Sequence, residues 1–190
     1  MQKIILASQS PRRKQLLQWA EIDFEVIVQP TRESYPDHLT IEEIPIHIAR
    51  NKALAVKQEQ PAGSIILAAD TVVVVDNKII GKPADKMEAM KFLSLLSGKR
   101  HLVITGVVIL QDAREIAFAD ITEVWFNELS PAQLEYYVDK YNPLDKAGAY
   151  AIQEWIGVIG IQKISGDFYN VMGLPVSRVV RELGRMATGQ

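Results

Sequence analysis

The sequence contains no cysteine among its 190 residues. This absence excludes disulfide bridges, thiolate metal sites and cysteine nucleophiles. A large excess of charge of one sign is also missing, since 21 lysines and arginines stand against 23 aspartates and glutamates, for a net charge of -2. A protein that binds nucleic acid over its whole surface is more basic than this. Any site for an anion must therefore be a local cluster of cations.

Long apolar runs are missing as well. No run approaches the ~18 residues of a membrane span, and the run at 4–7 is too short for the apolar region of a signal peptide. We therefore expect a cytoplasmic protein without a membrane partner. The hydrophobic fraction of 48% and the charged fraction of 23% are those of a globular chain. Because no linker or repeat is visible, we expect a single domain over residues 1–190, with at most two small lobes.

The order of expected elements is that of an α/β protein. Apolar and β-branched runs predict strands at 3–8, 24–28, 65–75, 78–80, 101–110, 117–126 and 158–164. Residues that favour helix N-termini predict helices that begin after Ser10, Thr40, Asp85 and Ser130 and at Pro175. Adjacent strands joined by short turns, beside several helices, indicate a mixed sheet.

Cations and hydroxyls gather where the first strand gives way to a helix. Ser8, Ser10, Arg12 and Arg13 lie there within six residues. Backbone N–H groups and the helix dipole attract anions to a helix N-terminus, and guanidinium and hydroxyl groups donate to phosphate oxygens. The glycines of a Walker loop are absent. The cluster is thus either a phosphate site or an ordinary capped helix with solvated arginines.

One acid interrupts the most apolar run of the chain. Asp70, followed by Thr71, lies within the strand expected at 65–75. Burial of a carboxylate is costly unless the carboxylate is paired or bound to a metal. We therefore favour a functional role for Asp70, although an aspartate at the end of a strand that bonds to a loop has the same pattern.

Two lysines and a second acid are weaker candidates. Lys52 lies on an otherwise apolar stripe of its helix, so it either extends along the edge of the stripe or points into a cleft. Lys82 is held in a Gly-Lys-Pro turn. Glu33 lies in a loop and carries no signal of its own. The three histidines show no metal-binding spacing.

Several stretches together resemble the signatures of the Maf family. They are LASQSPRRKQLL, AADTVVVVDNKIIGKP, LSGKRH, KAGAYAIQ and GDFYNVMGLPV. The resemblance covers nearly the whole chain. It implies the fold of inosine triphosphate pyrophosphatases, which is an elongated mixed β-sheet flanked by helices, with a cleft between two lobes. It also implies hydrolysis of nucleoside triphosphates to monophosphate and pyrophosphate with a divalent metal, Mg²⁺ or Mn²⁺, and a homodimer.

The resemblance also assigns roles to residues. Asp70 corresponds to the proton acceptor, and Asp70 with Glu33 would hold the metal. Lys52 and Lys82 fall at catalytic positions. The phosphate contacts fall on Ser8, Ser10 and Arg13. In the family an acid often precedes the position of Glu33, whereas this chain has Arg32 there, so that acidic pair is incomplete.

Three positions indicate the substrate. Arg12, Thr71 and Gln153 resemble the Maf proteins that act on dTTP and UTP, and a modified pyrimidine triphosphate fits the same pattern. The 7-methyl-GTP type typically has an aromatic residue after Ser-Pro and a glutamine after the catalytic aspartate, and this chain has neither. The alternatives are a 7-methyl-GTP pyrophosphatase and a regulator of septum formation that binds nucleotide without turnover.

Overall fold

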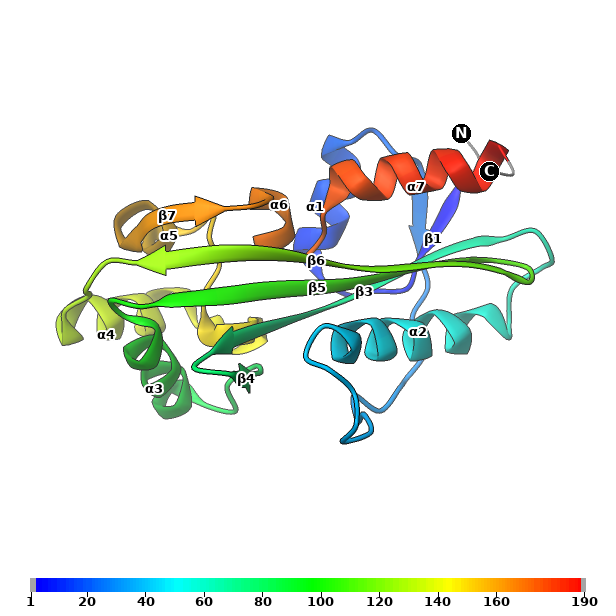
Figure 1. Ribbon diagram of the computed structural model, residues 1–190. Helices are drawn as coiled ribbons and strands as arrows, with labels where there is room; N and C mark the ends of the chain where they lie inside the picture. Colours follow the sequence, from blue (N-terminus) through cyan, green and yellow to red (C-terminus); the bar gives the residue numbers. More distant parts are fainter. Residues whose placement is uncertain (1–2, 189–190) are drawn as a thin grey trace. The chain divides into compact units, whose positions relative to one another are not determined.

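The computed structural model describes residues 3–188, which form a mixed sheet flanked by helices (Figure 1). The strand order is β2-β1-β3-β5-β6-β7, and β4 pairs with β3. This arrangement confirms the expected fold class. The chain divides into two compact units: the first comprises Met1–Asp70, Thr105–Asp120 and Gly173–Gln190, and the second comprises Thr71–Ile104 and Ile121–Met172. Strands β3, β5 and β6 contribute residues to both units.

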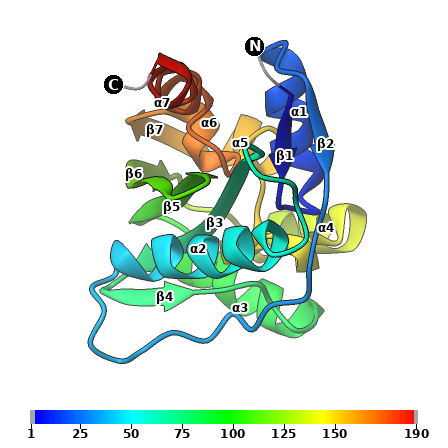
Figure 2. The same ribbon diagram turned by 90° about the vertical axis from the view of Figure 1, so that its right-hand side faces the viewer.

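The first unit contains the parallel part of the sheet. β1 (Ile4–Leu6) pairs in parallel with β2 (Phe24–Val26) and with the beginning of β3 (Ile65–Val75). The helices of this unit are α1 (Pro11–Trp19), α2 (Glu43–Lys57) and α7 (Val176–Thr188). Figures 1 and 2 show α2 on one face of the sheet and α1 with α7 on the opposite face.

Small side chains let α2 approach the sheet closely. Ala49 and Ala53 on α2 are fully buried in one cluster with strand residues such as Ile66 and Val108. A Cβ atom added at Gly106 on β5 would lie 2.2 Å from the backbone nitrogen of Ile46. Only glycine fits at this crossing, and the close approach fixes α2 against the strands.

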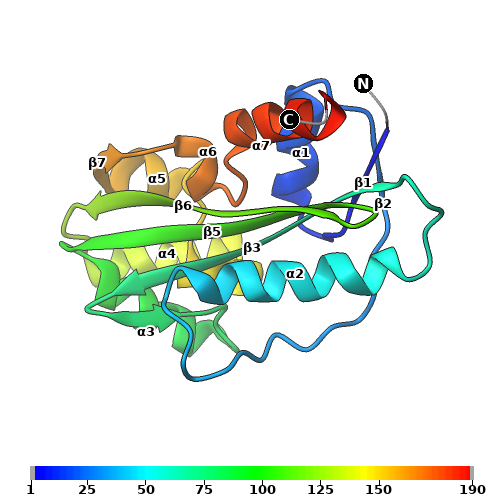
Figure 3. The ribbon, with the colours of Figure 1, turned by 45° about the vertical axis from the view of Figure 1, so that its right-hand side comes forward.

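The second unit contains antiparallel strands. β4 (Lys78–Ile80) pairs with the end of β3, and β7 (Ile161–Ser165) pairs with β6 (Arg114–Phe126). β5 (Arg100–Gln111) lies between β3 and β6. The helices are α3 (Lys86–Leu96), α4 (Pro131–Tyr141), α5 (Trp155–Gly160) and α6 (Phe168–Val171), with short 3₁₀ turns η1 (Pro143–Asp145) and η2 (Ala147–Ala149). α3 and α4 lie side by side (Figure 3).

The helix starts confirm the capping predictions. Ser130 and Gln133 form a reciprocal capping box at α4. Thr40 and Glu43 exchange the same pair of bonds before α2. Asp85 accepts a hydrogen bond from the backbone of Glu88 at α3. Such caps involve residues three positions apart, so the sequence alone is sufficient to predict them.

The sequence prediction misses helix α5. The strand expected at 158–164 begins only at Ile161, because Trp155–Gly160 forms α5. The backbone N–H groups of Gly157 and Val158 donate to the carbonyl of Glu154 and close a helical turn there.

The strand expected from residue 117 starts at Arg114 instead, because β5 and β6 extend to a tight turn at 112–113. The strands expected at 3–8 and 24–28 are shorter, at three residues each.

No helix within residues 3–188 is long and apolar enough to cross a membrane.

Candidate active site

A lysine joins two carboxylates in the first unit. Nζ of Lys52, on α2, lies 2.7 Å from Oδ1 of Asp70 on β3 and 2.8 Å from Oε1 of Glu33 in the loop that follows β2. Asp70 is 9% exposed, and the Glu33 side chain is 51% exposed. The cost of burying the Asp70 carboxylate is thus offset by an ammonium group that itself remains in contact with a solvated acid.

A buried arginine lies close to these carboxylates. Arg13, in the first turn of α1, is 8% exposed, and its Nε donates to the carbonyl of Gly173 over 2.7 Å. Burial lowers the pKa of Arg13 to about 10, and the charge of Asp70 acts in the opposite direction. The guanidinium therefore stays charged at neutral pH, and Arg13 is not one of the solvated arginines of the alternative interpretation.

Two serines arrange the start of α1. The hydroxyl of Ser8 accepts hydrogen bonds from Nη1 of Arg13 (3.1 Å) and from the backbone of Ser10 (3.3 Å). The hydroxyl of Ser10 accepts from the backbone N–H of Arg13 over 3.4 Å and so acts as the N-cap. Arg12, which precedes Arg13 on α1, is half-buried. The contacts of Ser8, Ser10 and Arg13 with a phosphate stay a prediction.

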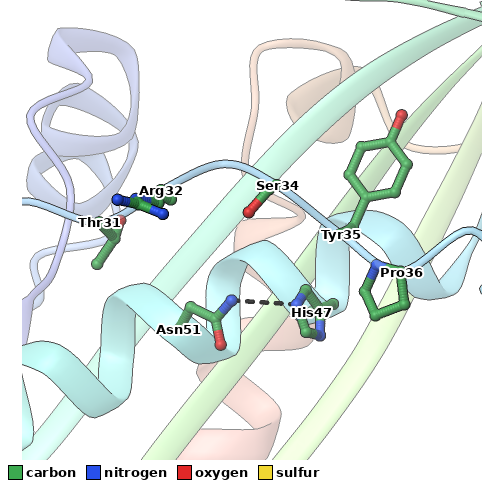
Figure 4. A pocket seen from close by; sticks show the side chains of 7 residues that line it. All are labelled: Thr31, Arg32, Ser34, Tyr35, Pro36, His47 and Asn51. Atoms are coloured by element: carbon green, nitrogen blue, oxygen red, sulfur yellow. Dashed lines mark hydrogen bonds between the residues drawn. The ribbon is translucent and has the colours of Figure 1, made fainter.

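A pocket of about 480 Å³ lies between α2 and the loop that carries Glu33. Figure 4 shows the loop passing over α2, with Thr31, Arg32, Ser34, Tyr35 and Pro36 from the loop and His47 and Asn51 from the helix. Arg32 and Ser34 flank Glu33 in the chain, and Asn51 precedes Lys52. The lining has a guanidinium, hydroxyls and an amide, and none of its seven residues is an acid.

The other predicted residues belong to the second unit. Thr71 follows Asp70 on β3 and is half-buried, whereas Lys82 and Gln153 are exposed. The carbonyl of Gly81 accepts a hydrogen bond from the backbone of Gly148 over 3.0 Å, so the Lys82 turn is tied to the segment that leads to Gln153. The roles of these three residues stay predictions.

Sequence reasoning missed Gly173. Its carbonyl accepts from Arg13, 160 residues earlier in the chain. Its φ of 112° lies in the region that favours glycine. The motif GDFYNVMGLPV contains Gly173 but does not indicate this contact. No local pattern indicates the partner of a carbonyl group that is so distant in sequence.

The donor set of the cluster fits a divalent metal. Mg²⁺ is commonly held by one or two carboxylates together with substrate phosphates and water. Asp70 and Glu33 supply two carboxylates around one lysine. Within residues 3–188, no group of three or more histidine, aspartate or glutamate side chains is arranged to hold a metal. A metal held here would therefore complete its coordination with substrate and water.

The fold and the cluster define an α/β protein with cations and carboxylates beside a mixed sheet, a combination suited to a phosphorylated ligand and a metal. The same fold occurs in the Ham1 protein of Staphylococcus aureus, with a TM-score of 0.53 and 17% identity over 95% of this chain and 100% of that chain.

The particular family follows from the sequence comparison. The Maf-like protein family matches residues 3–186, and the chain belongs to this family. A relative named dTTP/UTP pyrophosphatase from Cytophaga hutchinsonii is 51% identical over 96% of this chain and 84% of its own length. Another of the same name from Phocaeicola vulgatus is 49% identical over 97% of this chain and 96% of its own length. The family named from the motifs is thus confirmed.

Proposed function

We propose that the protein is a pyrophosphatase that hydrolyses dTTP and UTP to the monophosphate and pyrophosphate. The observation that carries the chemistry is the buried carboxylate of Asp70, held 2.7 Å from the ammonium of Lys52, with its charge also acting on Arg13. Relatives that are 46–51% identical over nearly the whole chain carry the name dTTP/UTP pyrophosphatase, which supports the substrate.

Asp70 acts on the attacking water in this proposal. The carboxylate accepts a proton from the water as its oxygen bonds to the α-phosphorus. The bond from the α-phosphorus to the bridging oxygen breaks, and pyrophosphate leaves with the electron pair of that bond. No covalent intermediate is required, which agrees with the absence of cysteine from the sequence.

Asp70 and Glu33 would hold the divalent metal. When bound, Mg²⁺ or Mn²⁺ neutralises negative charge on the phosphate oxygens. Lys52 orients both carboxylates by its two hydrogen bonds. Arg13 and Ser8 present donors to the triphosphate, and Lys82 adds a positive charge for the leaving pyrophosphate.

The base would be recognised by Arg12, Thr71 and Gln153. Thymine and uracil present two carbonyl acceptors and one N3–H donor. A glutamine amide carries both a donor and an acceptor and can complement this edge. The pairing edge of cytosine has an amino donor and a bare N3 acceptor, so a site built for uracil would leave buried polar groups unpaired.

Pyrophosphate release across a panel of nucleotides tests the proposal. We expect dTTP and UTP to be hydrolysed well above CTP, GTP and 7-methyl-GTP. A preference for 7-methyl-GTP would show that the proposed substrate is wrong and that the protein is a 7-methyl-GTP pyrophosphatase. Tight nucleotide binding without turnover would favour a regulator of septum formation. The homodimer and the cytoplasmic location stay expectations, of which light scattering tests the first.

A further inference from the structure

A buried histidine contacts the segment that carries Gln153. The Nε2 atom of His101, on β5, lies 2.7 Å from the hydroxyl of Tyr150, and both side chains are buried. Their rings meet edge to face at 5.4 Å, and each also packs against Phe126 at 5.0 Å. Burial lowers the pKa of His101 to about 3, so this imidazole is neutral at pH 7. It therefore acts by hydrogen bonding and packing, without charge.

A buried tyrosine contacts the same segment one residue later. Tyr137, on α4, is 0% exposed. Its hydroxyl accepts a hydrogen bond from the backbone N–H of Ala151 over 3.1 Å and donates to Oε2 of Glu154. The other oxygen of Glu154 lies 3.5 Å from Nζ of Lys146, which is 7% exposed. Tyr137 thus fixes the chain on both sides of Gln153.

The backbone of the segment is also packed against α5. A Cβ atom added at Gly157 would lie 1.7 Å from the carbonyl oxygen of Ile152. The N–H of Gly157 donates to the carbonyl of Glu154 over 2.9 Å. We call residues 150–154 the Gln153 turn. Tyr150, Ala151 and Ile152 are buried and Glu154 is half-buried, so Gln153 is the one exposed side chain of the turn.

We infer that Tyr137 and His101 are positioning residues that determine base specificity by holding the Gln153 turn in one conformation. The inference rests on the proposed function, in which Gln153 reads the pyrimidine edge. A side chain with several rotatable bonds selects a base only if its backbone is already fixed, because ordering it during binding costs free energy. His101 is neutral at pH 7, so it does not act on the phosphates through charge.

Tyr137→Phe tests the inference with the loss of one oxygen atom. The ratio of kcat/KM for UTP to that for CTP should fall about fivefold, which is the effect of one neutral hydrogen bond. The fall should come from a higher KM for UTP. The rate with CTP should stay within about twofold, since a site that does not match cytosine gains little from Gln153.

Tyr136→Phe is the matched control. Tyr136 is adjacent on α4, is 44% exposed, and its hydroxyl accepts from Lys140 instead of from the turn. This variant loses the same atom and should keep the wild-type ratio. Amide hydrogen exchange gives an independent readout: exchange at Ala151 should become faster in Tyr137→Phe and stay unchanged in Tyr136→Phe.

The double variant separates positioning from general damage. In a Gln153→Ala background, Tyr137→Phe should not change the UTP to CTP ratio further, because the side chain to be positioned is gone. An equal loss of activity on UTP and CTP would overturn the inference, because it would reveal a merely structural role. If Tyr137→Phe does not fold, Tyr150→Phe repeats the test, since it deletes only the hydroxyl that meets His101.

The same variants distinguish this inference from the proposed function. If the UTP to CTP ratio falls in Gln153→Ala but is unchanged in Tyr137→Phe and Tyr150→Phe, the positioning role is overturned and the proposed function is left intact. A ratio unchanged in Gln153→Ala would overturn both the base-reading role and the inference. Wild-type protein without activity on dTTP or UTP would overturn the proposed function itself.

Discussion

Nζ of Lys52 lies 2.7 Å from Oδ1 of Asp70. The two residues belong to the first unit and are 18 positions apart in the chain. Their side chains are 18% and 13% exposed. The contact answers two questions that the sequence left open. The acid in the apolar strand has a cationic partner, and the lysine points inward instead of extending along the edge of its helix.

Asp70→Asn should lower turnover by at least ~10²-fold, because the amide cannot accept a proton from water. The fold should persist, since the change preserves shape and Lys52 keeps its ion pair with Glu33. Steady-state pyrophosphate release and circular dichroism measure the two effects. Asp76→Asn is the control: this acid follows the same strand and pairs with the exposed Lys99. Turnover near the wild-type rate in folded Asp70→Asn would remove Asp70 from the mechanism.

Chelation with EDTA should abolish activity, and added Mg²⁺ or Mn²⁺ should restore it. Glu33→Gln should raise the metal concentration for half-maximal activity by roughly tenfold or more, because one of two carboxylates is lost. Titration of activity against Mg²⁺ measures this. Glu115→Gln, which alters an exposed acid paired with Arg50, should leave the titration unchanged. An unchanged titration in Glu33→Gln would exclude Glu33 as a metal ligand.

Lys82→Ala should lower kcat/KM for dTTP, UTP and CTP by the same factor, on the order of 10-fold or more. The reason is that a phosphate contact carries no information about the base. Lys86→Ala is the matched control, since Lys86 lies on the same unit and pairs with the exposed Asp139. A changed order of substrates with an intact best rate would contradict the phosphate role.

The preference of the enzyme among nucleotides should depend on the hydrogen-bonding groups at the pairing edge of the base. We expect dTTP and UTP to be similar, because the thymine methyl group does not alter that edge. CTP should be on the order of 10²-fold worse, since two mismatched polar groups cost about 1–3 kcal/mol each. Gln153→Ala should narrow the gap mainly by lowering activity on UTP. Equal kcat/KM for UTP and CTP in the unmodified protein would exclude recognition of this edge.

Stability should fall in mild acid because of His101. Burial lowers its pKa from the ordinary value of 6.5 to about 3 in the folded state. Between these values the unfolded chain binds a proton that the folded chain does not, so the free energy of unfolding decreases as the pH falls. One such group accounts for about 2 kcal/mol between pH 7 and pH 5.

Urea unfolding at several pH values measures this dependence. His101→Leu removes the titrating group and should flatten the slope by the equivalent of one proton. A slope that His101→Leu does not change would show that another group causes the acid sensitivity.

Local sequence was sufficient to predict structure where the interacting groups are close in the chain. The caps at Ser130 and Thr40 depend on residues three positions away, and both are confirmed. The apolar run that contains Asp70 predicted a buried strand with its bounds at Ile65 and Val75. The strand predicted from residue 158 is wrong up to Gly160, where the chain forms a short helix. The apolar residues and glycines of this stretch suit a strand as well as a short helix, so local sequence does not decide between them.

The sequence by itself determined the family and the mixed α/β class, and it predicted the residues of a candidate site. Only the tertiary structure decided which of them meet: Lys52 with Asp70 and Glu33, and Arg13 with Gly173 across 160 residues. It also revealed that Tyr137 and His101 hold the Gln153 turn. These contacts form only when helices and strands pack, because packing brings together groups that share no local pattern or spacing.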